Sequence, residues 1–223
     1  MSESAKKMAG EKAAEYVQDG HVVGLGTGST AYFAIVRLAE MVADGLSIRG
    51  IPTSESSAEL ARERHIPLID FSEAARIDVT IDGADEIDGD FNLIKGGGGA
   101  LLREKIVAAA TSTQIIVADD SKVKKTLGAF PLPVETTSFG WDMTRRHIEQ
   151  LGCQPQIRSL DGEAFVTDNG NLILDCPFEC IDEPGKLESE LRSIPGVVEC
   201  GLFVGLTNKV VLGNADGSIQ ELS

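Results

Sequence analysis

The chain contains 223 residues, 42% of them hydrophobic, so it is long enough to bury a core and is not a disordered polymer. Its 35 acidic and 20 basic residues give a formal net charge of −15, which disfavours nucleic acid and anionic membranes as partners. No apolar stretch approaches the roughly 18 residues of a membrane-spanning helix, and the amphipathic segment 1–16 lacks the apolar centre of a signal peptide. These features predict a globular, cytoplasmic protein.

The first 130 residues alternate short apolar runs with segments of helical period. Strands are expected at 21–26, 46–53, around 67–69, 77–82 and 114–120, and helices at 30–45, 54–65 and 99–111. This β-α rhythm predicts a three-layer, Rossmann-like α/β domain, in which a parallel sheet carries helices on both faces. Sheets of this kind bind ligands beyond the carboxyl ends of their strands, and the motifs described below fall at such ends.

From about residue 131 the order of elements becomes β-α-β-β-α-β, which is typical of a smaller ferredoxin-like α+β domain. Strands are expected at 131–137, 154–159, 165–176 (with an Asn169-Gly170 turn) and 197–205, and helices at 139–152 and 184–194. The segment 209–222 is a predicted hairpin that returns to the first domain. We therefore expect an α/β domain over 1–130 plus 206–223, and a ferredoxin-like domain over 131–205.

The first glycine-rich motif, Gly24 to Thr30, follows a predicted strand and opens a predicted helix. Glycines there let successive N–H groups point at one anion near the positive end of the helix, and Ser29 and Thr30 add hydroxyl donors. Two other interpretations remain. The segment could be a plain turn whose hydroxyls cap the helix, or a dinucleotide loop of the G-x-G-x-x-A type. A dinucleotide loop needs an acidic residue about 20 positions further on, and the nearest candidate, Glu55, matches that position poorly. The lysine of a nucleotide P-loop is missing.

The acidic motif Asp82 to Asp88 follows the alternating strand 77–82. The strand polarity places Asp82 at the carboxyl end and Asp85 one turn later, where two carboxylates can orient sugar hydroxyls and move protons. A solvated acidic turn is an alternative in so acidic a chain. A metal site is another, although the motif lacks the glycine placement and the final glutamate of a calcium loop.

The second glycine-rich motif, Lys95 to Ala100, precedes the helix that carries Glu104. Ordering four consecutive glycines costs roughly 0.5–1 kcal/mol each relative to alanine, so the run indicates close approach of backbone to a ligand. Its N–H groups and Lys95 suit a second anion, such as a developing enediolate oxygen. A flexible linker is the alternative.

Glu104 lies two positions from both Leu102 and Ile106, whose i, i+4 spacing marks an apolar face. Two residues turn a helix by about 200°, so we expect Glu104 to point away from that face. It could be a catalytic carboxylate or an ordinary surface glutamate. Lys122 follows the strand 114–120 and either closes the site or is a plain turn lysine.

The cysteines and histidines show no catalytic or zinc-binding spacing, and we expect neither a metal nor a cofactor. The cysteines are interpreted as reduced structural thiols, and all lie in the last third of the chain: Cys153, Cys176, Cys180 and Cys200.

Four motifs in this order, GLGTGST, IDGADEID, KGGGGALLREKI and ADDSK, resemble ribose-5-phosphate isomerase of type A. The later stretches FPLPVE, VTDNGNLILD and IPGVVECGLF are similar to the same family. The resemblance implies an aldose–ketose isomerase that interconverts D-ribose 5-phosphate and D-ribulose 5-phosphate through a cis-enediolate, in the non-oxidative pentose phosphate pathway. It also implies homodimers or homotetramers, with the ferredoxin-like domain serving oligomerisation.

The family's functional residues map onto matching positions of this chain. The resemblance implies that Glu104 is the proton acceptor, that Lys95, Asp82 and Asp85 are also catalytic, and that Lys6 reaches the phosphate. The implied substrate-binding residues are Thr27, Gly28, Ser29, Thr30, Asp82, Gly83, Ala84, Asp85, Lys95, Gly96, Gly97, Gly98 and Lys122. An alternative is a non-catalytic sugar-phosphate sensor of the same fold, although the presence of both Glu104 and Lys95 argues against it.

Overall fold

The computed structural model describes residues 3–214 and 216–223 and divides the chain into two units. Unit 1 comprises residues 1–84, 103–123 and 206–223, and unit 2 comprises residues 85–102 and 124–205. The expected domain bounds place residues 85–102 in the first domain, whereas their contacts group them with unit 2.

Unit 1 is built on a six-stranded sheet of order β15-β14-β6-β3-β1-β2. Its strands are β1 (Val22–Leu25), β2 (Arg49–Pro52), β3 (Ile77–Gly83), β6 (Thr111–Asp119), β14 (Lys209–Gly213) and β15 (Ile219–Leu222). All neighbours are parallel except β15, which forms the predicted hairpin with β14. The strand order reverses between β1 and β3, and doubly wound sheets bind ligands at the carboxyl ends beside such a reversal.

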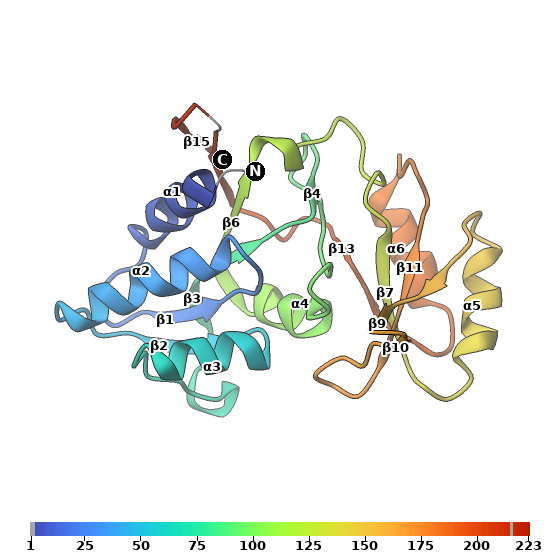
Figure 1. Cartoon of the computed structure of the whole chain (residues 1–223), viewed down its shortest axis with the longest axis horizontal. Coiled ribbons are helices and arrows are strands. Elements are labelled where there is room, and N and C mark those ends of the chain that lie inside the picture. The colour runs from blue at the N-terminus through green and yellow to red at the C-terminus, as the bar shows by residue number, and fades with distance from the viewer. Residues whose placement is uncertain (1–2, 215) are drawn as a thin grey trace. The chain divides into compact units, whose positions relative to one another are not determined.

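Helices cover both faces of this sheet, as predicted (Figure 1). They are α1 (Glu3–Ala14), α2 (Ala31–Ala43), α3 (Glu55–Glu63) and α4 (Leu101–Ala109), with short 3-10 turns η1 (Phe71–Glu73) and η2 (Asp120–Lys122). The helix α2 buries Ala31, Ala34, Ile35, Leu38 and Ala39, which is the i, i+3, i+4 spacing of one helical face.

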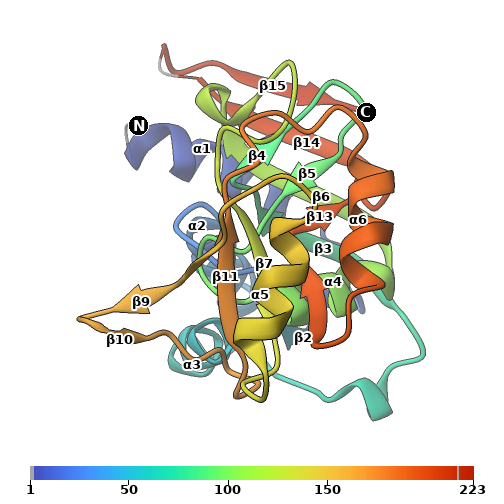
Figure 2. The same ribbon diagram turned by 90° about the vertical axis from the view of Figure 1, so that its right-hand side faces the viewer.

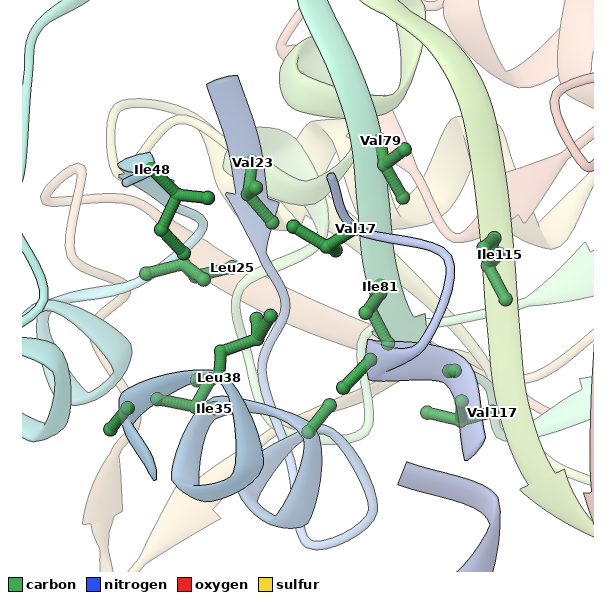
Figure 3. Packing of buried hydrophobic residues seen from close by; sticks show 14 of the residues in the cluster. Val17, Val23, Leu25, Ile35, Leu38, Ile48, Val79, Ile81, Ile115 and Val117 are labelled. Atoms are coloured by element: carbon green, nitrogen blue, oxygen red, sulfur yellow. The ribbon is translucent and has the colours of Figure 1, made fainter. Parts of the chain in front are cut away.

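The core of unit 1 lies between α1, α2 and one face of the sheet. Figure 3 shows Ile35 and Leu38 of α2 among side chains of β1, β3 and β6. Each such fully buried aliphatic side chain contributes roughly 1.5–3 kcal/mol. On the opposite face, Val107 of α4 packs in a smaller cluster with Val22 and Ile77. Both ends of the β1–α2 connection are therefore held rigidly.

Unit 2 contains a four-stranded antiparallel sheet of order β12-β7-β11-β8. Its elements are β7 (Leu132–Thr136), α5 (Trp141–Glu149), β8 (Gln156–Ile157), β11 (Leu172–Cys176), α6 (Pro184–Arg192) and β12 (Val197–Cys200). This connectivity and order are those of the predicted ferredoxin-like fold. Figure 2 shows α5 and α6 over the sheet, and a small hairpin, β9 (Ser159–Leu160) and β10 (Glu163–Ala164), that projects from its edge.

A second sheet of unit 2 was not expected from the sequence. It has the order β13-β5-β4 and consists of β4 (Glu86–Ile87), β5 (Leu93–Ile94) and β13 (Leu202–Phe203). The single strand predicted over 197–205 is wrong, because the chain leaves one sheet for the other at Gly201. The Gly201 N–H donates to the Pro133 carbonyl (2.7 Å), and a Cβ at Gly201 would overlap the Lys95 carbonyl. Only glycine permits this crossing.

The three cysteines at 153, 176 and 200 are buried in the unit 2 core, and Cys180 is exposed. No disulfide joins any of them in the described chain. Among the residues that the structure describes, no helix combines the length and apolarity needed to cross a bilayer.

Candidate active site

The first glycine-rich motif forms a tight connection from β1 to α2 in unit 1. A Cβ at Gly24 would overlap the Thr80 hydroxyl, and a Cβ at Gly26 would overlap the Asp82 carboxylate. The Gly26 N–H donates to the Ile81 carbonyl (3.0 Å), so the two strand ends lie in direct contact. Gly24 and Gly26 are thus required because β1 and β3 leave no room for a side chain at either position.

The N-terminus of α2 has the properties of an anion site. Thr30 is the N-cap residue of α2 but makes no side-chain capping bond, so capping does not explain its hydroxyl. In the described part of the chain, the N–H groups of residues 28–31 have no protein acceptor. The Lys6 ammonium donates to the Ser29 hydroxyl (2.6 Å) and adds positive charge beside them. Such a helix end is suited to bind a phosphate group.

A cavity of about 810 Å³ opens over this helix end. Among the residues lining it are Lys6, Gly28, Ser29, Tyr32, Ser56 and Ser57. The Thr27 hydroxyl points elsewhere, because it lies 2.7 Å from the hydroxyls of both Thr53 and Ser54. Sequence analysis missed this hydroxyl cluster, although the run of serines and a threonine directly after a predicted strand, TSESS at 53–57, was a signal for it.

Asp82 is the second-to-last residue of β3 and is buried beside the first glycine-rich motif. Its Oδ1 accepts from the N–H groups of Thr27 (3.0 Å) and Gly83 (2.8 Å). Hydrogen bonds from two backbone N–H groups hold the carboxylate in one orientation. Ala84 follows, and Lys122 lies in η2 at the end of the neighbouring strand β6. The adjacent ends of β1 and β3 therefore bring the 27–30 segment to Asp82, and Lys122 follows the end of the next strand in the sheet.

The expectation that Glu104 points away from the buried face of α4 is wrong. Glu104 is only 5% exposed, whereas Ile106 is 49% exposed. The buried stripe runs through Leu101, Glu104 and Ala108, with spacings of three and four residues. A carboxylate costs free energy when it is buried, so a glutamate in this stripe is not an idle surface residue.

The second glycine-rich motif is part of unit 2. Lys95 is 1% exposed, its N–H donates to the Gly201 carbonyl (2.8 Å), and its ammonium lies 5.5 Å from the centre of the Phe203 ring. A cation at this distance is attracted by the ring. Gly96 (φ +104°) and Gly99 (φ +83°) adopt left-handed backbone conformations that side chains disfavour. The motif is an ordered turn and not the flexible linker considered above.

Asp85 is hydrogen-bonded to this turn. Its Oδ2 accepts from the Gly97 N–H (2.7 Å), so that N–H is already committed within the protein. The Gly99 N–H donates to the Gly96 carbonyl (3.0 Å). Gly98 is an exposed residue, and its N–H has no protein acceptor among the described residues. Of these N–H groups, Gly98's is available to an anion.

The acidic motif 82–88 does not form a metal site. In unit 2, Glu86 accepts from the N–H groups of Gly128 (2.7 Å) and Phe130 (2.8 Å), and Asp88 accepts from the N–H of Asn92 (2.8 Å). Each carboxylate therefore serves a different backbone segment, and the oxygens do not converge on one point.

One other group of possible metal ligands occurs within the described chain, formed by Glu188, Glu199 and Cys200 of unit 2. Their ligand atoms lie within 4.8 Å of one another. The Arg192 Nε lies 3.7 Å from Glu199 Oε2, so a cation there would compete with a guanidinium. None of these three residues belongs to the sequence motifs above.

The dinucleotide interpretation is also disfavoured by geometry. Glu55, the candidate acidic residue, lies in the first turn of α3 and accepts from Arg103 Nη1 (2.8 Å). This hydrogen bond and charge lower the pKa of Glu55. The carboxylate is therefore committed to an ion pair and is not offered to a ribose.

Fold and site together define a class of protein: a doubly wound α/β protein with an anion site at a helix N-terminus and a buried lysine and glutamate nearby in the sequence. The chain matches the family Ribose 5-phosphate isomerase A (phosphoriboisomerase A) over residues 49–217. It is 54% identical to ribose-5-phosphate isomerase A of Bacillus cereus (strain ATCC 10987 / NRS 248), over 97% of this chain and 99% of that protein. It is 52% identical to ribose-5-phosphate isomerase A 1 of Oceanobacillus iheyensis, over 95% of both.

Solved structures of ribose 5-phosphate isomerases are also similar to this chain. Ribose 5-phosphate isomerase from Plasmodium falciparum is similar with a TM-score of 0.95 and 39% identity, over 100% of this chain and 99% of that one. A D-ribose-5-phosphate isomerase in complex with phospho-erythronic acid gives a TM-score of 0.94 and 37% identity, over 98% of this chain and 97% of that one. The chain belongs to the ribose 5-phosphate isomerase A family.

Proposed function

We propose that this protein interconverts D-ribose 5-phosphate and D-ribulose 5-phosphate, a reaction of the non-oxidative pentose phosphate pathway. The observation that carries the substrate class is the anion site at residues 28–31, where open N–H groups and the Lys6 ammonium meet beside a cavity. The family's name and the relative solved with phospho-erythronic acid, a phosphorylated sugar acid, support the same substrate class.

The phosphate end of the substrate binds to the 28–31 segment. Backbone N–H groups and the hydroxyls of Ser29 and Thr30 supply neutral donors, and Lys6 supplies the charge. This local arrangement is needed because the net charge of −15 repels an anionic substrate. Thr27 contributes through its backbone position, since its hydroxyl is bonded to Thr53 and Ser54.

Glu104 is the base of the proposed reaction. It removes the proton from C2 of the open-chain aldose, and the electron pair of that C–H bond forms the C1–C2 double bond. The π pair of the C1 carbonyl moves at the same time onto O1, which gives a cis-enediolate. Return of the proton to C1 gives the ketose. A carboxylate that is buried and held on a rigid helix is a suitable group for this transfer.

The charge that develops on O1 and O2 requires donors that are already in place. Lys95 supplies a buried ammonium, and Gly98 supplies an open N–H. Asp82 and Asp85, both held by backbone N–H groups, move the proton between the two oxygens and assist ring opening. Lys122 and the 83–84 and 96–97 segments complete the proposed substrate-binding set. We expect this chemistry to proceed without a metal or cofactor.

The test is formation of ribulose 5-phosphate from ribose 5-phosphate by the purified protein, with and without a chelator. We expect equal turnover in both, together with exchange of the C2 proton for solvent deuterium. No turnover with this substrate would overturn the proposed function. Loss of turnover after chelation would overturn its metal independence alone.

The alternative of a non-catalytic sugar-phosphate sensor explains fewer observations. A sensor needs the anion site, but it gains nothing from burying the charged residues Lys95 and Glu104. Phosphate binding without any C2 proton exchange would favour the sensor.

We also propose that the protein is a cytoplasmic homodimer or homotetramer. Unit 2 exposes several large apolar side chains, and Phe139 is 93% exposed. The others in this unit are Met143, Leu160 and Val166. These side chains support the 131–205 region as the oligomerisation surface. The molar mass from light scattering should be two or four times that of the chain, and a monomer at micromolar concentration would contradict it.

A further inference from the structure

The Arg158 guanidinium binds the backbone of the second glycine-rich motif within unit 2. Arg158 lies between β8 and β9, and its side chain is 15% exposed. Its Nη1 donates to the carbonyls of Gly96 (2.7 Å) and Gly97 (3.1 Å). Its Nε donates to Asp175 Oδ2 (3.0 Å), and Nη2 donates to Asp175 Oδ1. One planar group thus joins a carboxylate to two successive peptide carbonyls.

Both members of this pair are fixed by the sheet. The Arg158 N–H donates to the Ile173 carbonyl (2.8 Å), and its own carbonyl accepts from the Phe165 N–H (2.8 Å). Asp175 lies on β11, between Pro133 of β7 and Gln156 of β8. The guanidinium is therefore held at a defined place, and it transmits the geometry of the sheet to the glycine turn.

The direction of the carbonyls determines the direction of the N–H groups. In a trans peptide the C=O and the following N–H point in opposite directions. Binding the Gly96 carbonyl therefore turns the Gly97 N–H away from Arg158, and this N–H meets Asp85 Oδ2 at 2.7 Å. Binding the Gly97 carbonyl likewise turns away the Gly98 N–H, which has no protein acceptor in the described chain.

Glycine peptides flip easily, because no side chain restricts φ and ψ. Without an external restraint, residues 96–98 would sample orientations in which these two N–H groups point elsewhere. Asp175 neutralises the charge of Arg158, so the pair adds little net field to the site. Its contribution is therefore one of geometry.

We propose that Arg158, oriented by Asp175, is a positioning residue that directs the Gly98 N–H and, through the Gly97 N–H, the Asp85 carboxylate toward the reacting oxygens of the substrate. This inference rests on the proposed function, in which Gly98 stabilises the enediolate and Asp85 moves its proton. Arg158 itself does not touch the substrate.

The experiment compares Arg158→Ala with Arg145→Ala, in isomerase assays of the full-length protein with ribose 5-phosphate. Arg145 forms an ion pair with Glu149 on α5 of the same unit (3.7 Å) and is a matched control remote from the glycine turn in sequence. Loss of one oxyanion donor lowers kcat by about 10²–10³, and an indirect loss is smaller, so Arg158→Ala should lower kcat by about 10–10². The KM should change by less than about threefold, since the phosphate contacts are unaltered. Arg145→Ala should match the wild type.

Two further variants separate positioning from stability. Arg158→Lys should remain impaired, because a single ammonium cannot span Asp175 and two carbonyls. The double variant Arg158→Met with Asp175→Leu replaces the ion pair by apolar groups of similar size, which often leaves stability unchanged. It should fold with the wild-type Tm and still lose kcat. Millimolar guanidinium ion should restore part of the turnover of Arg158→Ala.

An unchanged kcat in Arg158→Ala would overturn the inference. The inference would also be overturned if Arg158→Ala lost kcat together with Tm, if guanidinium did not restore turnover, and if the double variant kept wild-type kcat. The Arg158–Asp175 pair would then serve only the stability of the fold. Glu104→Gln is assayed in parallel. If that variant is inactive and Arg158→Ala is fully active, the positioning role alone fails. If Glu104→Gln keeps wild-type turnover, the proposed active site fails and this inference fails with it.

Discussion

The two glycine-rich motifs use glycine for different physical reasons. In unit 1, Gly24 and Gly26 are required because β1 and β3 approach so closely that a Cβ would overlap Thr80 or Asp82. In unit 2, Gly96 and Gly99 are required because the chain turns through positive φ angles. Close contact between strands therefore shapes the start of the first motif, up to Gly26, and backbone conformation shapes the turn of the second.

The difference extends to how N–H groups are presented. At residues 28–31 the start of α2 aligns the N–H groups without help from side chains, as any helix N-terminus does. At residues 96–98 the direction of each N–H depends on Arg158 and Asp85. We infer that a helix N-terminus is sufficient to bind the phosphate group, which takes no part in the reaction. The charge that develops on O1 and O2 during the reaction needs N–H donors whose directions are each fixed by a side chain. The first motif should then control KM and the second kcat.

The largest expected effect is that of Glu104→Gln, a few residues after the second motif in the sequence. The variant should lower kcat by about 10²–10⁴, the usual range for loss of a general base, with little change in KM. The measurement is ribulose 5-phosphate formation, together with deuterium exchange at C2. Glu59→Gln, an exposed glutamate of α3, is the control. Near-normal turnover in Glu104→Gln would remove it as the base.

Lys95→Met tests the second motif directly, because it removes the charge and keeps most of the buried volume. We expect kcat to fall by about 10² and KM to rise, since the ammonium would stabilise the developing oxyanion and also attract the anionic substrate. The control is Lys186→Met, an exposed lysine of the same unit. If neither constant changes, Lys95 does not belong to the site.

Gly26→Ala and Gly28→Ala distinguish two reasons for glycine within the first motif, which are close contact with a neighbouring residue and a positive φ angle. The Cβ of Gly26→Ala would overlap Asp82, so we expect a loss of about 1–3 kcal/mol in the free energy of unfolding. Gly28 has φ +104° with open space around it, so its alanine variant should lose only about 1–2 kcal/mol from backbone strain. Urea denaturation measures both. A larger loss for Gly28→Ala would contradict the distinction drawn here.

Lys6→Ala should have the smallest effect and should act on binding. Loss of one charged donor at the phosphate should raise KM by about tenfold while kcat stays within about threefold. Inorganic phosphate should also become a weaker competitive inhibitor. Lys7→Ala is the control, because Lys7 pairs with Glu11 and does not line the cavity. A fall in kcat with unchanged KM would reverse the roles assigned to the two motifs.

The elements and their order follow from local sequence. The periodicity of apolar residues predicted the parallel sheet with helices on both faces, the ferredoxin-like connectivity and the hairpin β14–β15. The first glycine-rich motif follows a strand of the parallel sheet as expected, whereas the second follows β5 of the small antiparallel sheet. The Asn169-Gly170 turn is also present, with a Gly170 N–H bond to the Thr167 carbonyl (2.9 Å). These features depend on residues that are near one another in the chain.

Contacts between distant residues could not be predicted in this way. The phase of α4 was misjudged because Leu102 and Ile106 look like its apolar face, whereas the residues that are buried include Leu101 and Glu104 and leave Ile106 exposed. The break at Gly201 depends on the Lys95 carbonyl, about a hundred positions away in the chain. Arg158 lies 62 residues from Gly96, and nothing in its local sequence marks it.

By itself, the amino-acid sequence determined the fold class, the order of the elements and the two glycine-rich motifs, because periodicity and turn residues act over a few positions. The tertiary structure alone decided how each motif is held. The first is fixed by strand register, which brings Gly26 to Asp82, and the second by a salt bridge that turns peptide groups. Such details arise from the packing of distant segments, and no local pattern encodes them.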